Sequence, residues 1–521
     1  MRKLFLMSCL LMSALTFAYE VNFGPAETSA KRNRIQLLGQ INGKIYVYKF
    51  RALPLGVEKH TLHQFDPQTL EIANEVDLDI KNKNFEGMRI FNGKILIFQT
   101  EKDKDAGTVN MYYDVYDHKT MSPVKSNIQV AQYEFQKKLF NRYGSFSIHL
   151  SEKETKFAAY YNMPYEKGAE EKFGFSIYNE NAEKMYSVEA KLPVNDELMH
   201  LGGPHVSDKG TFYISATEVT EKSFFGRPKD VIHHIYKIND KGELKDYKID
   251  LPNKYISQYS YSTNENEDLI CSGLYGNRDN RTSGVDGGFY LRIDGSTGDI
   301  AESSFKDFPL DFITAGWSDR AKEKAEKKQS KGKGNPTLYE YDVRDIVPLD
   351  DGGAVLTAEQ FYIRVVTTRD PNTGATRTTY YYYYNDIIVM KLNKEGKFDW
   401  YAKIPKYQVS TNDGGYFSSF SFHVGNGKLY FMFNDNMKNY TKGNVVGGKT
   451  YAASFASNKK NVTSLVEMNI SDGKYTKNQL FGKSELKTIA VPKIYHSDRK
   501  ENVLFIYGKK SRQERLGRIK F

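Results

Sequence analysis

Residues 35–50, IQLLGQINGKIYVYKF, hold the pattern that decides the fold. They predict a β-strand, a tight turn at Asn42-Gly43 and a second strand in which aliphatic residues alternate with Tyr. A further pair of strand-like segments flanks DPQT at residues 66–69, where the Asp side chain and the fixed φ of Pro favour a type I turn. Residues 35–80 therefore predict one unit of four antiparallel strands.

The same unit recurs along the rest of the chain. A tight turn followed by an apolar strand is found near residues 42, 92, 152, 209, 265, 352, 426 and 499. The later turn, between the two outer strands, recurs as DPQT, DHKT, NENA, NDKG, DGSTG, NKEG and SDGK. The last unit thus runs out of chain before its fourth strand. Because radial repetition protects the edges of four-stranded sheets, we predict an all-β fold, a β-propeller of four-stranded antiparallel blades.

Eight blades are expected, with seven as the alternative, in a single propeller domain spanning residues 19–521. The expected blades span residues 35–80, 86–130, 143–193, 200–252, 257–310, 339–405, 416–480 and 486–521. Residues 19–25, YEVNFGP, are expected to close the last blade, because a ring must join its final blade to its first. An open stack of sheets, or two β-domains divided near residues 311–336, is the other arrangement that the repeats allow.

The first 18 residues predict a signal peptide. Arg2 and Lys3 precede an apolar segment, residues 4–17, that is too short to span a bilayer, and residues 16–18 fit a cleavage site. A lipoprotein signal through Cys9 is the alternative, but it leaves only a short apolar segment before the cysteine. We expect an exported protein of the periplasm, the cell surface or the medium. No later stretch has the roughly 18 apolar residues of a spanning helix, so no transmembrane segment is expected.

Composition and charge limit the kinds of partner that the protein is expected to bind. The net charge of +10, from 74 basic and 64 acidic residues, is a modest excess that permits contact with anionic surfaces without requiring it. For an exported chain we expect an envelope protein or an extracellular glycan as partner, and no nucleic acid. The sequence contains no zinc-protease, serine-hydrolase, phosphate-loop, dinucleotide-loop or EF-hand motif. No cofactor and no metal site is therefore predicted.

Residues 311–336 interrupt the repeats with a basic insertion. Ser318 could cap a helix within residues 318–331, a segment rich in Lys, Glu and Ala that ends before Gly332. The segment has no apolar stripe, so it predicts a solvated helix or an unstructured excursion. It could act as a basic lid over the loop face, or it could be a surface excursion without a binding role.

Three histidines align when the first strands of the blades are compared. SFSIH at residues 145–149 matches SFSFH at residues 419–423, and His205 ends a nearly equivalent strand. Period-two geometry places the Ser and His side chains on one face, which in a propeller borders the central channel. His149, His205 and His423 could then converge to bind a metal or an anion, or act as acid or base. The alternative is that they are polar residues lining a wet channel.

A run of tyrosines, residues 380–384, lies in a long predicted hairpin between the second and third strands of its blade. Alternation sends the rings to both faces of the hairpin, so about half should be exposed. Tyr380, Tyr382 and Tyr384, with Trp317, are candidate ligand-binding residues that could stack on sugar rings or grip a peptide. The alternative is that the tyrosine rings only cover the surface of a hairpin that packs over neighbouring strands.

Two segments carry a resemblance to a known class. VPLDDGGAVLTAEQ at residues 347–360 and NDIIVMKLNKEGKFDWYAKIP at residues 385–405 resemble repeats of uncharacterised exported bacterial β-propeller proteins. The resemblance implies a propeller fold and assigns no functional residue. We expect an exported binding or scaffold propeller whose loop face engages its partner. The alternative is a propeller enzyme, a hydrolase or lyase, that acts on a glycan or peptide at the central channel.

Overall fold

The computed structural model describes residues 19–28, 33–53, 57–80, 83–135, 144–164, 168–195, 197–222, 228–277, 284–332, 336–441, 451–453, 455, 460–482 and 487–521. The expected signal peptide, with the alternative lipoprotein cysteine Cys9, lies outside the described residues. Within them, no helix combines the length and the apolar character that a membrane crossing needs.

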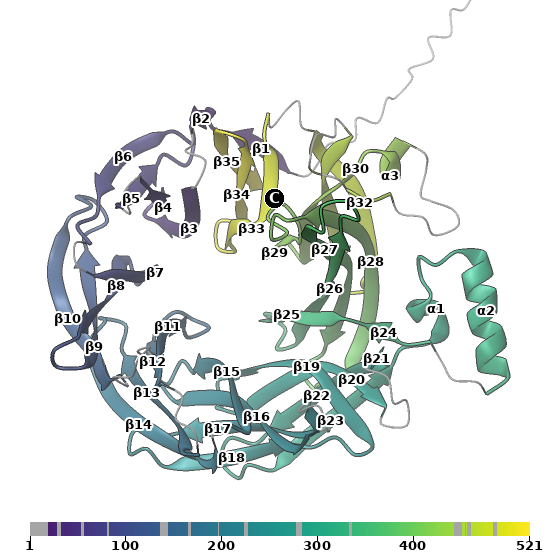
Figure 1. The fold of residues 1–521 in the computed structure, drawn as a ribbon, viewed down its shortest axis with the longest axis horizontal. Coiled ribbons are helices and arrows are strands. Elements are labelled where there is room, and N and C mark those ends of the chain that lie inside the picture. Colours follow the sequence, from purple (N-terminus) through teal and green to yellow (C-terminus); the bar gives the residue numbers. More distant parts are fainter. Residues whose placement is uncertain are drawn as a thin grey trace, which may run out of the picture.

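The described strands form a ring of antiparallel sheets around a central opening (Figure 1). Seven sheets consist of four consecutive long strands, and the eighth joins strands from the two ends of the chain. We number these sheets as blades 1 to 8 in chain order. In each blade the first strand lies beside the opening and the last strand lies on the outside of the ring (Figure 1). The predicted propeller of four-stranded antiparallel blades is confirmed, with eight rather than seven blades.

The strands of the first four blades have the following bounds. Blade 1 contains β3 (Asn33–Ile41), β4 (Lys44–Ala52), β5 (Glu58–Phe65) and β6 (Ile72–Asp77). Blade 2 contains β7 (Asn84–Phe91), β8 (Lys94–Asp103), β9 (Thr108–Tyr116) and β10 (Pro123–Glu134). Blade 3 contains β11 (Ser145–Leu150), β12 (Phe157–Asn162), β13 (Glu170–Tyr178) and β14 (Lys184–Asn195). Blade 4 contains β15 (Met199–Val206), β16 (Phe212–Lys222), β17 (Pro228–Ile238) and β18 (Leu244–Ile249).

The remaining blades follow in order. Blade 5 contains β19 (Lys254–Thr263), β20 (Leu269–Asn277), β22 (Gly287–Ile293) and β23 (Ile300–Asp307). Blade 6 contains β25 (Tyr341–Pro348), β26 (Ala354–Arg369), β27 (Thr376–Leu392) and β28 (Phe398–Thr411). Blade 7 contains β29 (Ser421–Gly425), β30 (Lys428–Asn436), β31 (Asn461–Asn469) and β32 (Tyr475–Gly482). Blade 8 contains β33 (Ile489–Asp498), β34 (Val503–Lys510), β35 (Gln513–Lys520), β1 (Glu20–Phe23) and β2 (Glu27–Thr28).

The turns form for local reasons. Asn42 and Gly43 both have positive φ, 47° and 74°, as a two-residue turn of a twisted hairpin requires. The outer turn of blade 1 is capped by Asp66, whose Oδ1 accepts hydrogen bonds from the backbone N–H groups of Gln68 at 2.9 Å and Thr69 at 3.1 Å. Equivalent side-chain caps occur at the outer turns of other blades, at Asp117, Asn179, Asn239 and Asp294.

The hydrophobic core is divided among the interfaces between neighbouring blades. Eight large clusters of buried side chains each take residues from two adjacent blades. One of them lies between blades 8 and 1, where Val47 of β4 and Phe505 of β34 belong to the same cluster. Every blade is therefore buried on both faces, as a closed ring requires.

A helical insertion leaves the ring between blades 5 and 6 and lies outside it (Figure 1). It contains α1 (Leu310–Ile313) and α2 (Asp319–Ser330), and β21 (Gly284–Val285) pairs with β24 (Leu338–Tyr339) beside it. The helix predicted within residues 318–331 is confirmed. Ser318 occupies the N-cap position, but its side chain makes no capping hydrogen bond. Another short helix, α3 (Lys438–Thr441), follows β30.

The seam between the two ends of the chain lies in blade 8. Strand β1 pairs antiparallel with β35, from Glu20 opposite Lys520 to Phe23 opposite Gly517. Lys49 of blade 1 places its Nζ 2.8 Å from Glu27 Oε2 on β2. The same Nζ is 2.8 Å from an oxygen of Glu514 on β35, and the Arg515 side chain donates to the Gly24 carbonyl. The N-terminal segment thus contacts both blade 8 and blade 1.

Replacing Gly24 by Ala should weaken this seam, because a Cβ added at Gly24 would lie 2.4 Å from the carbonyl oxygen of Leu70. A backbone atom cannot rotate away, so we expect the free energy of unfolding to fall by about 1–3 kcal/mol. Urea unfolding followed by circular dichroism measures the change. Gly203→Ala is the matched control, since a Cβ there meets nothing within 4 Å. Equal stability of the two variants would contradict the tight seam.

Candidate functional site

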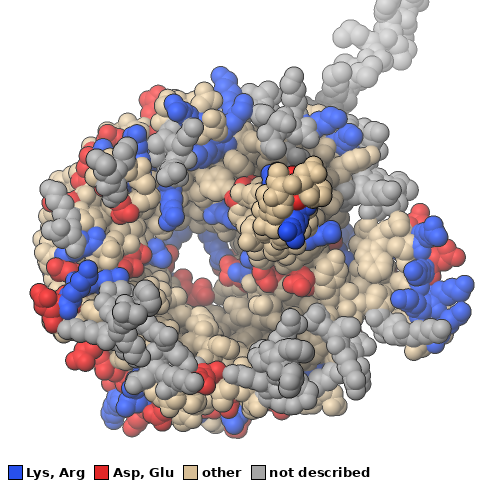
Figure 2. All heavy atoms as spheres, in the orientation of Figure 1, with Lys and Arg blue, Asp and Glu red and all other residues tan. Residues whose placement is uncertain are grey.

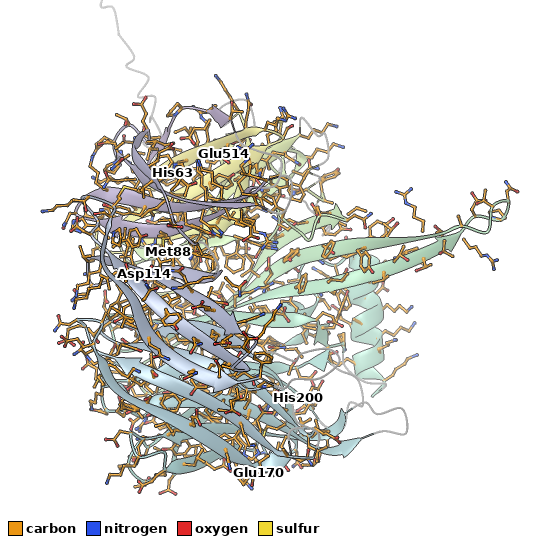
Figure 3. All side chains as sticks on the ribbon, turned by 60° about the vertical axis from the view of Figure 1, so that its left-hand side comes forward. His63, Met88, Asp114, Glu170, His200 and Glu514 are labelled. Atoms are coloured by element: carbon orange, nitrogen blue, oxygen red, sulfur yellow. The ribbon has the colours of Figure 1, made fainter. Side chains whose placement is uncertain are left out.

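The hairpin of β26 and β27 is the most extended feature of the molecule. Its strands have 16 and 17 residues, and in Figure 3 the hairpin projects far beyond the body of the ring. Its neighbours support only its base: β25 pairs with β26 no further than Gln360, and β28 pairs with β27 no further than Tyr381. We call residues 361–384 the projecting arm, which has only two strands from the Val365–Tyr380 pair to its tip.

Apolar side chains are exposed on one face of this arm. Val365 lies opposite Tyr380 and Ile363 lies opposite Tyr382 in the strand register. Val365 is 54% exposed, Ile363 46% and Tyr380 44%. On the other face, the rings of Tyr362 and Tyr383 stack with their centroids 4.6 Å apart. The arm therefore offers an aliphatic and aromatic surface that no other described strand covers.

Tyr384 does not belong to this exposed surface, although the alternation pattern grouped it with Tyr380 and Tyr382. It is buried against Phe361, with ring centroids 4.6 Å apart, and burial raises its pKa to about 12. Lys493 of β33 donates a hydrogen bond of 2.8 Å to its hydroxyl and lies 4.2 Å from the ring centroid. Tyr384 thus anchors the base of the arm to blade 8, and its ring is not available to a ligand.

Trp317 is also separate from the arm. It is half-buried in the segment between α1 and α2, two helices that lie outside the ring (Figure 1). Within the described part of the chain, no ring contact joins it to a tyrosine of β27. The structure therefore does not assemble Trp317 and the tyrosines into one platform.

A buried ionic network lies beneath the arm. The fully buried Lys406 and Glu359 form an ion pair, with Nζ 2.6 Å from Oε1. The other oxygen of Glu359 accepts hydrogen bonds from the Ser419 hydroxyl at 2.7 Å and from Arg344 Nε at 3.0 Å. Lys406 also donates to the side chain of Gln408 at 3.2 Å. These residues come from blade 6 and from the connection to blade 7, so the network fixes the arm relative to the next blade.

Sequence reasoning missed this network. Its only signal is Glu359 within the apolar run AVLTAEQF, an ionisable residue where a buried strand is expected. Nothing in the sequence indicates which cation would reach it, because Lys406 is separated from it by 47 positions.

The first strands of blades 3 and 4 place two of the predicted histidines near the central opening, which passes between charged side chains in Figure 2. His149 Nε2 lies 2.8 Å from the Ser147 hydroxyl, and His205 Nε2 lies 3.0 Å from the Thr263 hydroxyl. Burial lowers the pKa of each imidazole to about 4, and for His149 the charge of Arg89 adds to the effect. Both imidazoles are therefore neutral at neutral pH.

His423 does not join them, so the expected convergence of three histidines is wrong. It is fully buried, with Nδ1 2.8 Å from the Ser497 hydroxyl and Nε2 2.9 Å from Asn502 Oδ1. The ring of Phe521 stacks on it at 4.9 Å between centroids. Blade 8 therefore covers His423, although the local sequence around this residue resembles that around His149. Among the described residues, no group of three His, Cys, Asp or Glu side chains could hold a metal ion.

The chemistry open to Ser147 and His149 is limited. A Ser–His pair acts as nucleophile and base when a third group orients the imidazole and supports its positive charge. Within the described residues no carboxylate hydrogen-bonds to His149, and the nearby charge that affects it is the cation Arg89. A proton on this imidazole is disfavoured, so the pair is suited to hydrogen bonding rather than to base catalysis.

No protein-family model matches the chain, and no curated protein matches it. Solved structures similar to it include the β-propeller domain of the Trilobed protease from Pyrococcus furiosus, at 12% identity over 84% of this chain and 95% of that chain, with a TM-score of 0.35. An uncharacterized protein from Listeria monocytogenes is 9% identical over 82% and 90% of the two chains, with a TM-score of 0.36. A protein of unknown function from Bacteroides caccae is 10% identical over 66% and 90%, with a TM-score of 0.27. At these identities the likeness concerns the fold alone.

Lys406→Met should destabilise the protein by about 3 kcal/mol, because it leaves the buried Glu359 carboxylate without its closest cation. The double variant Glu359→Gln, Lys406→Met should recover part of the loss, since it removes both buried charges. Urea unfolding measures both effects. Lys394→Met is the control, because the Lys394 side chain is 71% exposed. A loss no larger than that of the control would show that the network does not support the base of the arm.

The two channel histidines should make the protein sensitive to acid. An unfolded histidine has a pKa near 6.5, and the folded values of His149 and His205 are about 4, so the folded state binds protons less readily. Their contribution is complete above about pH 6.5 and is lost as the pH falls toward 4, by on the order of 2–3 kcal/mol for each group.

Thermal unfolding at pH 7 and pH 4.5 tests this dependence. His205→Gln should lose less stability between the two pH values than the wild type, because one of the two groups is absent. His200→Gln, at an exposed position, should behave as the wild type. If all three proteins respond equally to pH, the acid sensitivity has another origin.

Proposed function

We propose that this protein is a binding propeller that holds a segment of a partner protein on the projecting arm. The observation that carries the proposal is the exposure of Ile363, Val365 and Tyr380 on one face of the projecting arm, which has only two strands from Val365 and Tyr380 to its tip. Isolated two-stranded hairpins are marginally stable in water, and contiguous exposed apolar surface marks interaction sites. A partner that covers this face would stabilise the arm.

Among the described residues, no strand pairs with the outer edge of the arm. Strand β26 continues to Arg369, nine residues past its last pairing with β25 at Gln360. An exposed edge strand presents unpaired N–H and C=O groups, and an extended peptide can add to it as a further strand. The segment from 362 to 368 carries one charged residue, Arg364, so few charges protect the edge from such pairing.

The charges of the arm indicate which kind of partner segment would bind to it. Arg364, Arg369 and Arg377 are exposed on it, against one exposed acidic residue, Asp370. A partner strand that alternates apolar with acidic side chains would satisfy both the apolar face and the cations. The expected export signal directs the proposal toward a protein of the envelope or the extracellular space. An extracellular glycan, stacked on the tyrosine rings, is the competing ligand.

A photo-crosslinking amino acid at Tyr380 tests the proposal in cells that make the protein naturally. We expect one discrete adduct that yields peptides of a second protein in mass spectrometry after tryptic digestion, because the ligand is a protein. The matched control places the same amino acid at Met185, which is 46% exposed on β14 of blade 3. Adducts of equal pattern at both positions would contradict the arm as the binding surface, and a crosslinked peptide that carries sugar mass in place of a second peptide would favour the glycan.

The purified partner then permits a direct measurement of affinity. The double variant Ile363→Asp, Val365→Asp should weaken binding by about 100-fold or more, because it places charge in the centre of the apolar contact. Met185→Asp should bind as the wild type does. Unchanged affinity of the arm variant in isothermal titration calorimetry would contradict the proposal.

A further inference from the structure

We infer that the outer edge of β23 is a peptide-binding site, which takes an extended acidic segment of another protein as an additional strand of blade 5. Strand β23 is the last strand of its blade and lies on the outside of the ring (Figure 1). The site shares no residue with the projecting arm, so it does not depend on the function proposed for that arm.

A cavity of about 670 Å³ runs along this edge of β23. Six consecutive residues of the strand, 301–306, line it, together with Glu395, Lys397 and Phe398 of blade 6. Successive side chains of a strand point to opposite faces of the sheet, so a cavity that touches all six residues follows the edge of the strand rather than one face. Its volume lies in the range that is typical of ligand-binding sites.

The backbone of β23 has no partner strand on the side of this cavity. Within the described part of the chain, β23 pairs with β22 and with no other strand. Among the described residues, no backbone hydrogen bond joins residues 301–306 to an element other than β22. The outward N–H and C=O groups of β23 can therefore pair with an extended peptide, which adds to the sheet as a further strand.

One face of β23 is polar and is turned toward blade 6. Ser304 lies opposite Tyr290 in the strand register. Tyr290 packs against the turn between β27 and β28, because a Cβ added at Gly396 in that turn would collide with the Tyr290 ring. Since alternate residues share a face, Glu302 and Lys306 lie on the same side as Ser304. A peptide added to β23 would place every second side chain beside these polar groups.

The other face of β23 is apolar. Phe305 lies opposite Phe289, which belongs to the core cluster between blades 4 and 5. The ring of Phe305 meets that of Tyr275 at 5.9 Å between centroids, yet its side chain remains 38% exposed. An apolar side chain of a bound segment would cover the exposed part of this ring, and removing that surface from water would stabilise the complex.

The cavity is cationic, because its carboxylates lie near cations whereas its ammonium groups have no carboxylate. Glu302 Oε1 lies 3.0 Å from a guanidinium nitrogen of Arg292, and Glu395 Oε1 lies 3.7 Å from the ammonium of the preceding lysine. Within the described residues, no carboxylate lies at ion-pair distance from Lys306 or Lys397. Acidic side chains on the blade 6 face of a bound strand would supply the missing charges.

Isothermal titration calorimetry with a peptide of seven alternating Glu and Val residues, blocked at both ends, tests the site. The titrated protein is the full-length Ile363→Asp, Val365→Asp variant, so that the projecting arm does not contribute to binding. We expect saturable binding with a Kd on the order of 0.1 mM. Adding Lys306→Gln and Lys397→Gln to this protein should weaken binding about tenfold, because both cations of the site are lost.

The matched control adds Lys125→Gln and Arg512→Gln instead, two exposed positions on other blades, and should bind as its parent does. A peptide with Lys in place of Glu should not bind, because it meets the cations of the cavity with like charge.

A second experiment tests strand pairing separately from charge. The N–H groups of a strand point alternately to its two edges, so N-methylation of either the Glu or the Val nitrogens should abolish binding, and methylation of the other set should preserve it. Hydrogen exchange followed by mass spectrometry should show slower exchange in residues 300–307 when the unmethylated peptide is bound.

Four results would overturn the inference. These are no saturable binding of the Glu-Val peptide, equal binding of the Lys peptide, equal binding of both methylated peptides, or unchanged affinity of the Lys306→Gln, Lys397→Gln protein at an unchanged melting temperature. Because the arm is disabled throughout, none of these results bears on the function proposed for the arm.

Discussion

The closing of the ring is the constraint on which the rest of the structure depends. A blade buries both of its faces only if it has a neighbour on each side, and blade 8 meets blade 1 through strands from opposite ends of the chain. The backbone pairing of β1 with β35 supplies this connection, and Lys49 joins Glu27 to Glu514 across it. Because every interface transmits the position of its blade to the next one, the seam also fixes the width of the central opening and the side chains that meet there.

How much could be predicted from the sequence depends on how far apart along the chain the interacting residues lie. The repeats were predictable because each turn is determined locally: Asn42-Gly43 adopts positive φ, and Asp66 caps its own turn. The candidate site was not predictable, because the local sequence does not indicate which distant residues cover a side chain. His149 and His423 occupy the same SFxxH-like setting, SFSIH and SFSFH, yet only His423 is covered by Phe521. Likewise, no pattern within a strand indicates that Glu359 meets Lys406.

The base of the projecting arm explains how a long hairpin can hold a direction. Its first residues belong to the body of blade 6, where Glu359 links Lys406 to Ser419 in the connection to blade 7. Above this network the Tyr384 hydroxyl accepts a hydrogen bond from the Lys493 ammonium of blade 8. Blades 6 and 8 and the connection to blade 7 therefore contribute to the base, and the ionic contacts have few alternative partners in a buried environment. The arm leaves the ring from a fixed platform, so a partner on it meets a surface that is already positioned.

The projecting arm keeps apolar side chains in an environment that folding alone does not favour. Val365 stays 54% exposed, although burying an aliphatic side chain would stabilise the fold. At the base of the arm and at the seam the opposite holds, because the buried charges there form ion pairs, Glu359 with Lys406 and Lys49 with Glu514. Local disagreement with the rules of stability is typical of functional sites, so the contrast between the paired base and the uncovered apolar face supports the binding role proposed for the arm.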